Sequence, residues 1–438
     1  MGADLEQIRW WSWRRQRLDR TCRGVDDCLR SIVGVYSANP TAALSLLARV
    51  PRIMQGMVDG AIESRIALRL PAMRRTVWML HAETAHLALH ATSTDAGSKW
   101  FLRRQGLTEE EFDRLEHEIL LATGRPATSE RIREAIKDPP EKLTPVLQAL
   151  CASGKLLRIK AKTPLSNAFS YAATRVWLGH ELPEADPVEA LVWLAGDYLK
   201  AFGPASVGDF AWWAGVQPEH ADAALRAHDP EDVGDGLLMW PNDVHAFEGT
   251  RAVANRVNLL PAWDAYTMGY AEASRARFAD PELLPYLYDK GGNATSVILI
   301  DGTVGGLWDF TLSDRKIEIR IGLFEDPMPR ALAAIEAEAG LVAGYFNART
   351  VEIRRVKIRN ALSTRTGGSH LKPLAGQDAK PARLKPAPPA KPAPAAKPAP
   401  VARMTPGPAA KTAAPSKTPA PAKTATPRPA KRPSGSKG

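Results

Sequence analysis

Hydrophobic and polar positions in the first hundred residues follow two different periods. Apolar side chains recur every three or four residues in three stretches, which predicts amphipathic helices over Ile8–Leu18, Val25–Tyr36 and Pro40–Val50. Two shorter stretches are alternating or continuously apolar, which predicts strands over Ala67–Leu70 and Arg75–Leu80. Residues 1–100 are therefore expected to form a first domain of helices followed by a strand pair.

The next segment, residues 101–180, begins with a strong helix signal. Thr108 followed by Glu111 is a capping box, which predicts an amphipathic helix to about Ala122. Helices over Ser129–Ile136 and Pro145–Ser153 follow, the second with Pro145 in its first turn and Gly154 just past its end. Strands are expected over Lys155–Lys160 and Phe169–Trp177. Three helices and a two-stranded hairpin predict a winged helix, and residues 1–100 are interpreted as a divergent one.

Residues 181–256 repeat this cycle. Asp186-Pro187 begins a helix to about Ala201, and Ser206 with Asp209 caps a second one over Val207–Ala214. A third helix over Pro218–Ala227 precedes two expected strands, Leu237–Trp240 and Val244–Phe247. These helix caps, helices and strands predict a third winged helix.

The pattern changes after Val257. Apolar runs on either side of Asp301-Gly302 predict a tight hairpin, because Asp-Gly favours a two-residue turn. A strand over Ile317–Leu323, a helix over Pro329–Phe346 and a last strand over Thr350–Ile358 complete residues 257–362. The predicted fold class is α+β, with tandem winged helices followed by a small β-rich domain with one helix.

Composition separates the last residues, 363–438, from the rest. From Thr366 onward there are 14 Lys and Arg against one acid, with 17 of the 36 prolines and no aromatic residue. Such a segment cannot bury enough apolar surface to offset its chain entropy, so an unfolded, extended tail is expected. Its cations, among them Lys385, Lys391, Lys397, Lys431 and Arg432, are interpreted as sequence-independent phosphate contacts. A solubilising tail, or one that binds another acidic partner, is the alternative.

Several classes of protein are excluded. The N-terminus lacks the pattern of a signal peptide, and no stretch is apolar enough to span a membrane. The three Cys are too few and too irregularly spaced for a disulfide framework. His81, Glu83, His86 and His90 do not have the His-Glu-x-x-His spacing, so no metal site is expected, and no cofactor motif is present. We expect a reduced, cytoplasmic protein.

Three stretches resemble the AlkZ-type family of DNA glycosylases, also described as winged helix DNA-binding domain-containing proteins. They are the segments 198–215 (YLKAFGPASVGDFAWWAG), 259–270 (LLPAWDAYTMGY) and 297–308 (VILIDGTVGGLW). The similarity covers about residues 5–360. It implies tandem winged helices, a concave DNA-binding surface and hydrolysis of the N-glycosidic bond of alkylated or crosslinked bases.

The resemblance fails at the residues that carry the family's chemistry. The Gln-x-Gln or Gln-x-Asp motif of these enzymes aligns with Tyr36, Ser37 and Ala38, and alanine has no polar atom with which to hold a water. Asn39 is close, but its use needs a shift of one residue. The family's Arg-Gly-Thr-Leu-His stretch reads Arg74-Arg75-Thr76-Val77-Trp78, without the glycine and the histidine. No residue is therefore assigned as catalytic.

Candidate contacts to duplex DNA come from two places. The resemblance points to Arg74, Arg75 and Thr76. The expected wing of residues 154–176 adds Arg158, Lys160, Lys162 and Arg175 without an acid, and Ser166 or Asn167 at its tip could reach a groove. The third winged helix carries many acids against one basic residue, Arg226, so it is expected to repel phosphate.

The favoured hypothesis is a nucleoid-associated protein that binds double-stranded DNA and is non-catalytic or catalytically altered. A divergent DNA glycosylase using other residues is the first alternative. A transcriptional regulator, which would need a symmetric dimer and a defined operator, is the second.

Overall fold

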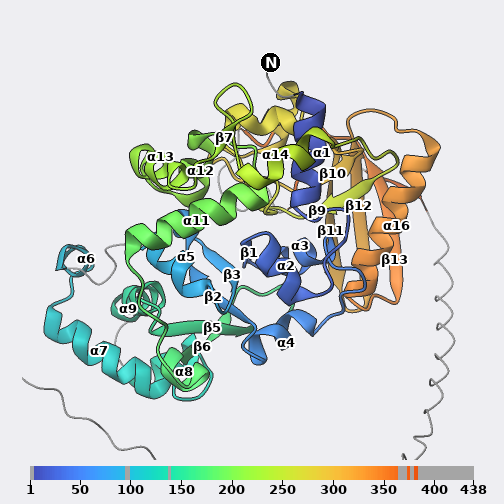
Figure 1. Cartoon of the computed structure of the whole chain (residues 1–438). Helices are drawn as coiled ribbons and strands as arrows, with labels where there is room; N and C mark the ends of the chain where they lie inside the picture. The colour runs from blue at the N-terminus through green and yellow to red at the C-terminus, as the bar shows by residue number, and fades with distance from the viewer. Residues whose placement is uncertain (1–3, 94–98, 137–139, 364–371, 375–378, 383–438) are drawn as a thin grey trace, which may run out of the picture. The chain divides into compact units, whose positions relative to one another are not determined.

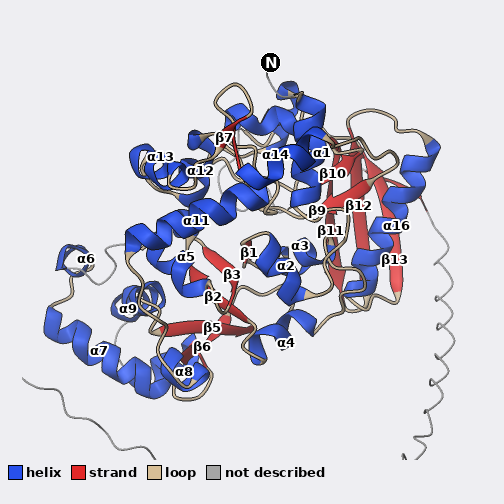
Figure 2. Ribbon diagram, in the orientation of Figure 1, coloured by secondary structure: helices blue, strands red, loops and turns tan. Residues whose placement is uncertain are grey.

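The computed structural model describes residues 4–93, 99–136, 140–363, 372–374 and 379–382 (Figures 1 and 2). These residues belong to one compact unit that ends at Pro386. Helices and strands are mixed along the whole unit, so the chain is a mixed α/β protein.

The first segment folds around a three-stranded antiparallel sheet of order β1-β3-β2. Its elements are α1 (Leu5–Arg15), α2 (Val25–Ser31), β1 (Gly34–Tyr36), α3 (Thr41–Leu47), α4 (Met57–Glu63), β2 (Ala67–Pro71), β3 (Val77–His81) and α5 (Ala85–Ala91). The predicted helix Val25–Tyr36 is wrong in its second half. The helix ends at Ser31, Val33 takes a left-handed φ of 68°, and β1 then pairs with β3. That partner lies some forty residues further along the chain, beyond the reach of local periodicity.

The second segment has a three-stranded sheet of order β4-β6-β5. Its elements are α6 (Lys99–Arg104), α7 (Glu109–Ala122), β4 (Ala127–Thr128), α8 (Ser129–Ile136), α9 (Pro140–Ala152), β5 (Leu156–Ala161), β6 (Phe169–Ala173) and α10 (Thr174–Leu178). The capping box of Thr108 and Glu111 is confirmed. Two predictions are wrong: α9 begins before Pro145, which lies inside the helix, and the last strand ends at Ala173, where α10 begins.

The third segment is mainly helical. It contains α11 (Pro187–Phe202), α12 (Val207–Ala214), α13 (Pro218–Arg226), β7 (Glu231–Asp232), β8 (Leu238–Met239) and α14 (Val244–Glu248). The caps at Asp186 and at Ser206 with Asp209 are confirmed. The second expected strand is wrong: Val244–Glu248 is a helix, and β8 pairs with β7 instead.

One order of elements recurs in these three segments. A helix, an extended stretch, two helices and two strands follow one another, as in α2-β1-α3-α4-β2-β3 and α7-β4-α8-α9-β5-β6. In both, the first strand pairs with the last. The third segment has a single bridge in that place, between Ala205 and Leu238 of β8. The three segments thus share a topology.

The remaining strands form a six-stranded sheet of order β14-β13-β12-β11-β10-β9. The elements are β9 (Val257–Leu260), α15 (Leu284–Leu287), β10 (Val297–Ile300), β11 (Thr303–Ser313), β12 (Lys316–Leu323), α16 (Pro329–Tyr345), β13 (Thr350–Val356) and β14 (Ala379–Ala382). The hairpin at Asp301-Gly302 is confirmed, with left-handed φ values of 48° and 80°. The helix α16 connects the parallel strands β12 and β13 and lies against β9 and β13 (Figure 1).

Part of the segment predicted as an unfolded tail lies against this sheet. Leu374 is fully buried, and its backbone N–H donates to the buried carboxylate of Asp309 at 2.7 Å. Asp309 also accepts from Arg320 at 2.5 Å, and β14 pairs antiparallel with β13. The expected start of the tail at residue 363 is therefore too early for residues 372–374 and 379–382.

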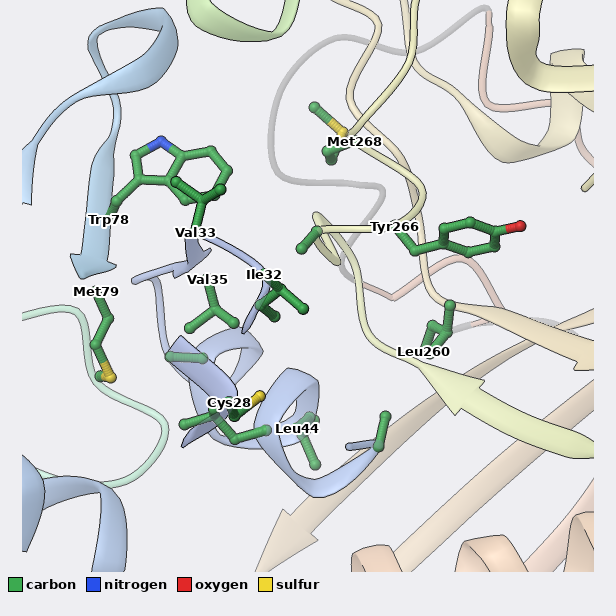
Figure 3. Packing of buried hydrophobic residues seen from close by; sticks show 14 of the residues in the cluster. Cys28, Ile32, Val33, Val35, Leu44, Trp78, Met79, Leu260, Tyr266 and Met268 are labelled. Carbon is green, nitrogen blue, oxygen red and sulfur yellow. The ribbon is translucent and has the colours of Figure 1, made fainter. Parts of the chain in front are cut away.

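Buried hydrophobic residues of the described chain form one large core and one smaller core beside it. One continuous core joins the first segment to α11, α12 and the six-stranded sheet. Figure 3 shows part of it, with Val35 and Met79 on one side and Leu260, Tyr266 and Met268 on the other. A smaller core joins buried residues of α6, α7, α8, α9 and β5.

Candidate functional site

Four of the residues singled out in the sequence line one cavity of about 640 Å³: Tyr36, Arg75, Thr76 and Arg158. The wall is completed by β2, α5, α6, the turn after α6, and α9, which add Phe101, Arg104, Gln105 and Gln148 among others. The charged side chains on this wall are Arg75, Arg104 and Arg158, and no carboxylate lies among the described lining residues. The cavity is therefore cationic and suited to a ligand that carries phosphates.

Tyr36 is the last residue of β1, where it pairs with Trp78 of β3. Its ring is half-buried and lies 4.8 Å from the ring of Trp263, with an interplanar angle of 58°. Burial raises the pKa of the Tyr36 phenol, and the nearby Arg74 opposes that shift. The hydroxyl is therefore neutral near pH 7, where it can donate and accept hydrogen bonds but is a poor base.

Trp263 is held in place by its neighbours. Its backbone has a left-handed φ of 57°, and its N–H donates to the carbonyl of Ala294 at 3.0 Å. The next residue, Asp264, accepts two hydrogen bonds of 2.8 Å from Arg49, and both of these side chains are fully buried. The loop after β9 is therefore anchored to α3 and its C-cap region, which supports the Tyr36 ring from one side.

The three residues that follow Tyr36, which are Ser37, Ala38 and Asn39, form with it the motif segment, and none of the three lines the cavity. The carbonyl of Ala38 accepts from the N–H of Ala42, at the start of α3. The backbone N–H of Asn39 donates a hydrogen bond to the Oδ1 of Asn167 (2.7 Å), and its side-chain Nδ2 donates to the carbonyl of Ser166 (2.9 Å). Asn39 is thus bonded to the β5–β6 hairpin, and the shift of one residue that would make it a replacement for Ala38 has no support in this geometry.

The stretch from Arg74 to Thr76 forms a tight turn between β2 and β3. Arg74 and Arg75 have left-handed φ values of 55° and 57°. At Arg75, where the sequence resemblance expects a glycine, the backbone has a conformation that glycine adopts without strain. The Thr76 hydroxyl donates to Met73 and accepts from the indole of Trp78. Arg74 stacks over Trp212 at 4.2 Å, and burial lowers its pKa. Of the three, only Arg75 is exposed.

The remaining basic candidates are spread over other surfaces. Lys160 lies 3.4 Å from the carboxylate of Glu63, Lys162 is exposed beside the hairpin turn, and Arg175 of α10 lines a different cavity. Of the wing residues, only Arg158 reaches the cavity of Tyr36. Lys385, Lys391, Lys397, Lys431 and Arg432 lie outside the described residues.

Several residues of the cavity were missed in the sequence. Gln148 is an exposed polar residue of α9, Arg104 ends α6, and the exposed Gln105 lies in the turn that follows. Nothing in the local pattern distinguishes them from an ordinary solvated face. Trp263 stood within a stretch used for the resemblance, but its neighbour Tyr36 is contributed by a strand more than two hundred residues away.

Within the described ranges, no three His, Cys, Asp or Glu side chains gather as ligands of one ion would. No helix in this part of the chain is both long and apolar enough to cross a membrane. Cys22, Cys28 and Cys151 are free and buried.

The fold and the cavity together define a mixed α/β protein with a cationic cavity beside an aromatic pair. Comparison with known proteins gives this class a family. The sequence model described as DNA glycosylase AlkZ-like matches residues 30–345. An "Interstrand DNA cross-link repair glycosylase" of Streptomyces sahachiroi is 24% identical over 383 residues, which cover 81% of this chain and 100% of that protein. The solved structure of the Streptomyces sahachiroi DNA glycosylase AlkZ superposes with a TM-score of 0.65 at 20% identity, with the same coverage.

The chain belongs to the AlkZ-like DNA glycosylase family. This confirms the resemblance noted in the three sequence stretches. The comparisons favour the hypothesis of a DNA glycosylase over that of a non-catalytic DNA-binding protein, because the similar proteins are themselves glycosylases.

Proposed function

We propose that this protein is a DNA glycosylase that binds damaged double-stranded DNA and accepts the damaged base in the cavity beside Tyr36. The observation that carries the proposal is the position of Tyr36. It stands where the family has the first residue of its motif, and it forms part of the wall of a cavity whose charged residues are all arginines.

The arginines would hold the DNA backbone. The cavity is lined by three arginines: Arg75 from the turn before β3, Arg104 from α6 and Arg158 from β5. A guanidinium group can bind two phosphate oxygens at once. A base that leaves the stack gains a partner in the Tyr36 ring, which Trp263 supports from behind. We further propose that the recurring topology of the first three segments corresponds to three winged helices, of which the second contributes Arg158 and α9. We include in this proposal the domain boundaries predicted near residues 100, 180, 256 and 362.

The chemistry of the cavity suits a base that departs easily. An N7-alkylated purine is already cationic, so it leaves as a neutral molecule and needs no general acid. The attacking water needs a polar group that orients it, and the amides of Gln105 and Gln148 or the Tyr36 hydroxyl can do this. The phosphates next to the lesion would neutralise the three guanidinium groups, which otherwise disfavour a positively charged sugar intermediate.

A second candidate function is recognition of damaged DNA without excision. Ala38 favours it, because this residue lacks a polar atom at the second motif position and does not line the cavity. Association with the nucleoid through the basic tail is compatible with either function.

One experiment separates the two candidates. The full chain is incubated with a duplex that contains a single N7-methylguanine, and the released base is measured by chromatography. Release by the wild type, lost in Tyr36→Ala and reduced in Gln148→Ala, supports excision in this cavity. Tight lesion binding without release supports the second candidate. If the protein neither prefers the lesion nor releases the base, both candidate functions are contradicted.

A further inference from the structure

The two residues on either side of Ala38 are both attached to the β5–β6 hairpin. Asn39 donates its backbone N–H to Asn167 and its side-chain amide to the carbonyl of Ser166, at 2.7 and 2.9 Å. Both acceptors belong to the turn of the hairpin, whose closing bond runs from Lys162 N–H to the carbonyl of Ala168. The tip of the hairpin is therefore bonded to the motif segment, whereas the sequence suggested that it reaches outward.

Ser37 is attached to the strands of the same hairpin through Arg69. This arginine of β2 has a fully buried side chain, and its Nε donates to the Ser37 hydroxyl at 3.0 Å. One of its terminal nitrogens donates to the carbonyl of Ile159 in β5, and its guanidinium lies 4.8 Å from the ring of Phe169 in β6. Arg69 thus contacts Ser37 and both strands of the hairpin.

The hairpin also carries cations on or near the proposed DNA surface. Arg158 of β5 lines the cavity of Tyr36, and Lys160 and Lys162 are exposed further along the strand and turn. A two-stranded hairpin has little stability of its own, so its position depends on the contacts at its tip and base. In this protein those contacts are made with Asn39 directly and with Ser37 through Arg69, two residues that follow Tyr36.

We propose that Asn39 and Arg69 are positioning residues, which couple phosphate contact at the β5–β6 hairpin to the placement of Tyr36. This inference rests on the proposed function, because it assumes that the hairpin contacts DNA. A duplex held by Arg158 and the exposed lysines restrains the hairpin, and the bonds to Asn39 and Ser37 pass that restraint to the motif segment. The segment then holds Tyr36 in one position against the damaged base, which is where small displacements cost most.

Residue-resolved hydrogen exchange of the full chain tests the coupling without any requirement for turnover. In the wild type, an undamaged duplex is expected to slow exchange of the Asn39 amide by about tenfold, since restraint of the hairpin strengthens its bond to Asn167. The amide of Val304, which is bonded to the carbonyl of Phe278 far from the hairpin in sequence, serves as an internal reference and should change little.

Two variants remove the bonds from opposite sides. Asn167→Ala removes the acceptor of the Asn39 amide, and Asn39→Ala removes the donor to Ser166. Asn167→Ala is expected to abolish the slowing by DNA, whereas Asn39→Ala, which keeps the backbone N–H bond to Asn167, is expected to reduce it. The double variant should match Asn167→Ala, because both bonds join the same two loops. Thr163→Ala, at an exposed position of the same turn, is the matched control and should behave as the wild type.

The readouts keep this inference distinct from the proposed function. By linkage, the duplex affinity of Asn39→Ala should fall by less than the tenfold slowing expected in the wild type. The single-turnover rate of base release at saturating protein should fall about tenfold, as expected of a misplaced site. Slowing by DNA that persists in both variants would overturn the coupling even if bases are released. A wild type that binds duplex and shows no slowing at Asn39 would overturn it as well. Absence of base release with intact coupling would instead contradict only the glycosylase proposal.

Discussion

The ring of Tyr36 lies 4.8 Å from the ring of Trp263, centroid to centroid, although β1 supplies one residue and the loop after β9 the other. The pair joins the motif segment to the part of the chain that carries the six-stranded sheet. The left-handed backbone of Trp263 and the buried bonds of Asp264 hold the second ring where the first can rest on it.

The first prediction concerns this pair. Trp263→Ala should lower the free energy of unfolding by about 1–2 kcal/mol, because an aromatic pair is lost together with part-buried surface. It should also weaken lesion binding severalfold, since the Tyr36 ring loses its support. Trp263→Phe keeps a ring and should restore most of both. Chemical denaturation and fluorescence anisotropy with a lesion duplex measure the two effects, and full lesion affinity in Trp263→Ala would argue against a supporting role.

The second prediction concerns pH. Burial raises the pKa of Tyr36, so the neutral phenol is favoured in the folded protein. Lesion binding by the wild type and by Tyr36→Phe should therefore run parallel between about pH 6 and pH 9, where a phenol is not ionised in either state. Above about pH 10 the phenol ionises first in the unfolded chain. The contribution of the neutral Tyr36 to the free energy of unfolding is therefore lost as pH rises through the raised pKa of the folded protein. Tyr36→Phe should lack that loss. A step in wild-type binding near neutral pH that is absent from Tyr36→Phe would contradict a neutral Tyr36.

The third prediction concerns Arg75. Arg75→Gly should leave stability unchanged or raise it by up to about 1 kcal/mol, because glycine adopts the left-handed φ of 57° without strain. The same change should weaken duplex binding and lower the slope of log affinity against log salt by about one, the signature of one lost phosphate contact. Arg226→Ala, in the acidic third segment, is the control and should affect neither. An unchanged salt slope would remove Arg75 from the DNA surface.

The fourth prediction concerns the ion pair that anchors the Trp263 loop. Arg49 and Asp264 are both fully buried, so removal of one partner leaves an unpaired charge in the core. Asp264→Ala should cost about 3–5 kcal/mol, and the paired change Arg49→Met with Asp264→Leu should cost much less. Urea denaturation measures both. Equal losses for the single and double variants would show that packing, and not the charge, dominates at this site.

The fifth prediction concerns the tail. Truncation after Pro386 should lower duplex affinity and flatten its salt dependence with no change in melting temperature, since it spares Leu374. Truncation after Ser363 should also destabilise the fold by about 2–4 kcal/mol, because it removes a fully buried leucine and the N–H that Asp309 accepts. Binding that is unchanged by the shorter truncation would leave the tail without a role on DNA.

Local signals predicted much of the fold. The capping boxes at Thr108 and Ser206 and the turn at Asp301-Gly302 were read correctly because each is decided by residues within four positions of one another. The strand at Tyr36 is missed because its partner β3 lies far along the chain. The strand expected over Val244–Phe247 is wrong because this stretch forms the helix α14, and β8 pairs with β7. Short apolar runs do not distinguish helix from strand.

The candidate site was predicted less completely. Motif alignment identified Tyr36, Arg75 and Thr76, and charge pattern identified Arg158, all of which line the cavity. Gln148 and Trp263 required tertiary structure, because they come from helices and loops that meet only in the fold. The bonds of Asn39 to the hairpin likewise join positions 128 and 127 residues apart.

Lesion discrimination tests the central claim most directly. Dissociation constants are measured at one salt concentration for a duplex with a single N7-methylguanine and for the same duplex undamaged, with the wild type and Tyr36→Ala. Acceptance of the damaged base beside Tyr36 predicts a wild-type preference for the lesion of at least about tenfold, and its loss in Tyr36→Ala with unchanged affinity for the undamaged duplex. Equal affinity of the wild type for both duplexes, or a preference that survives in Tyr36→Ala, would contradict it.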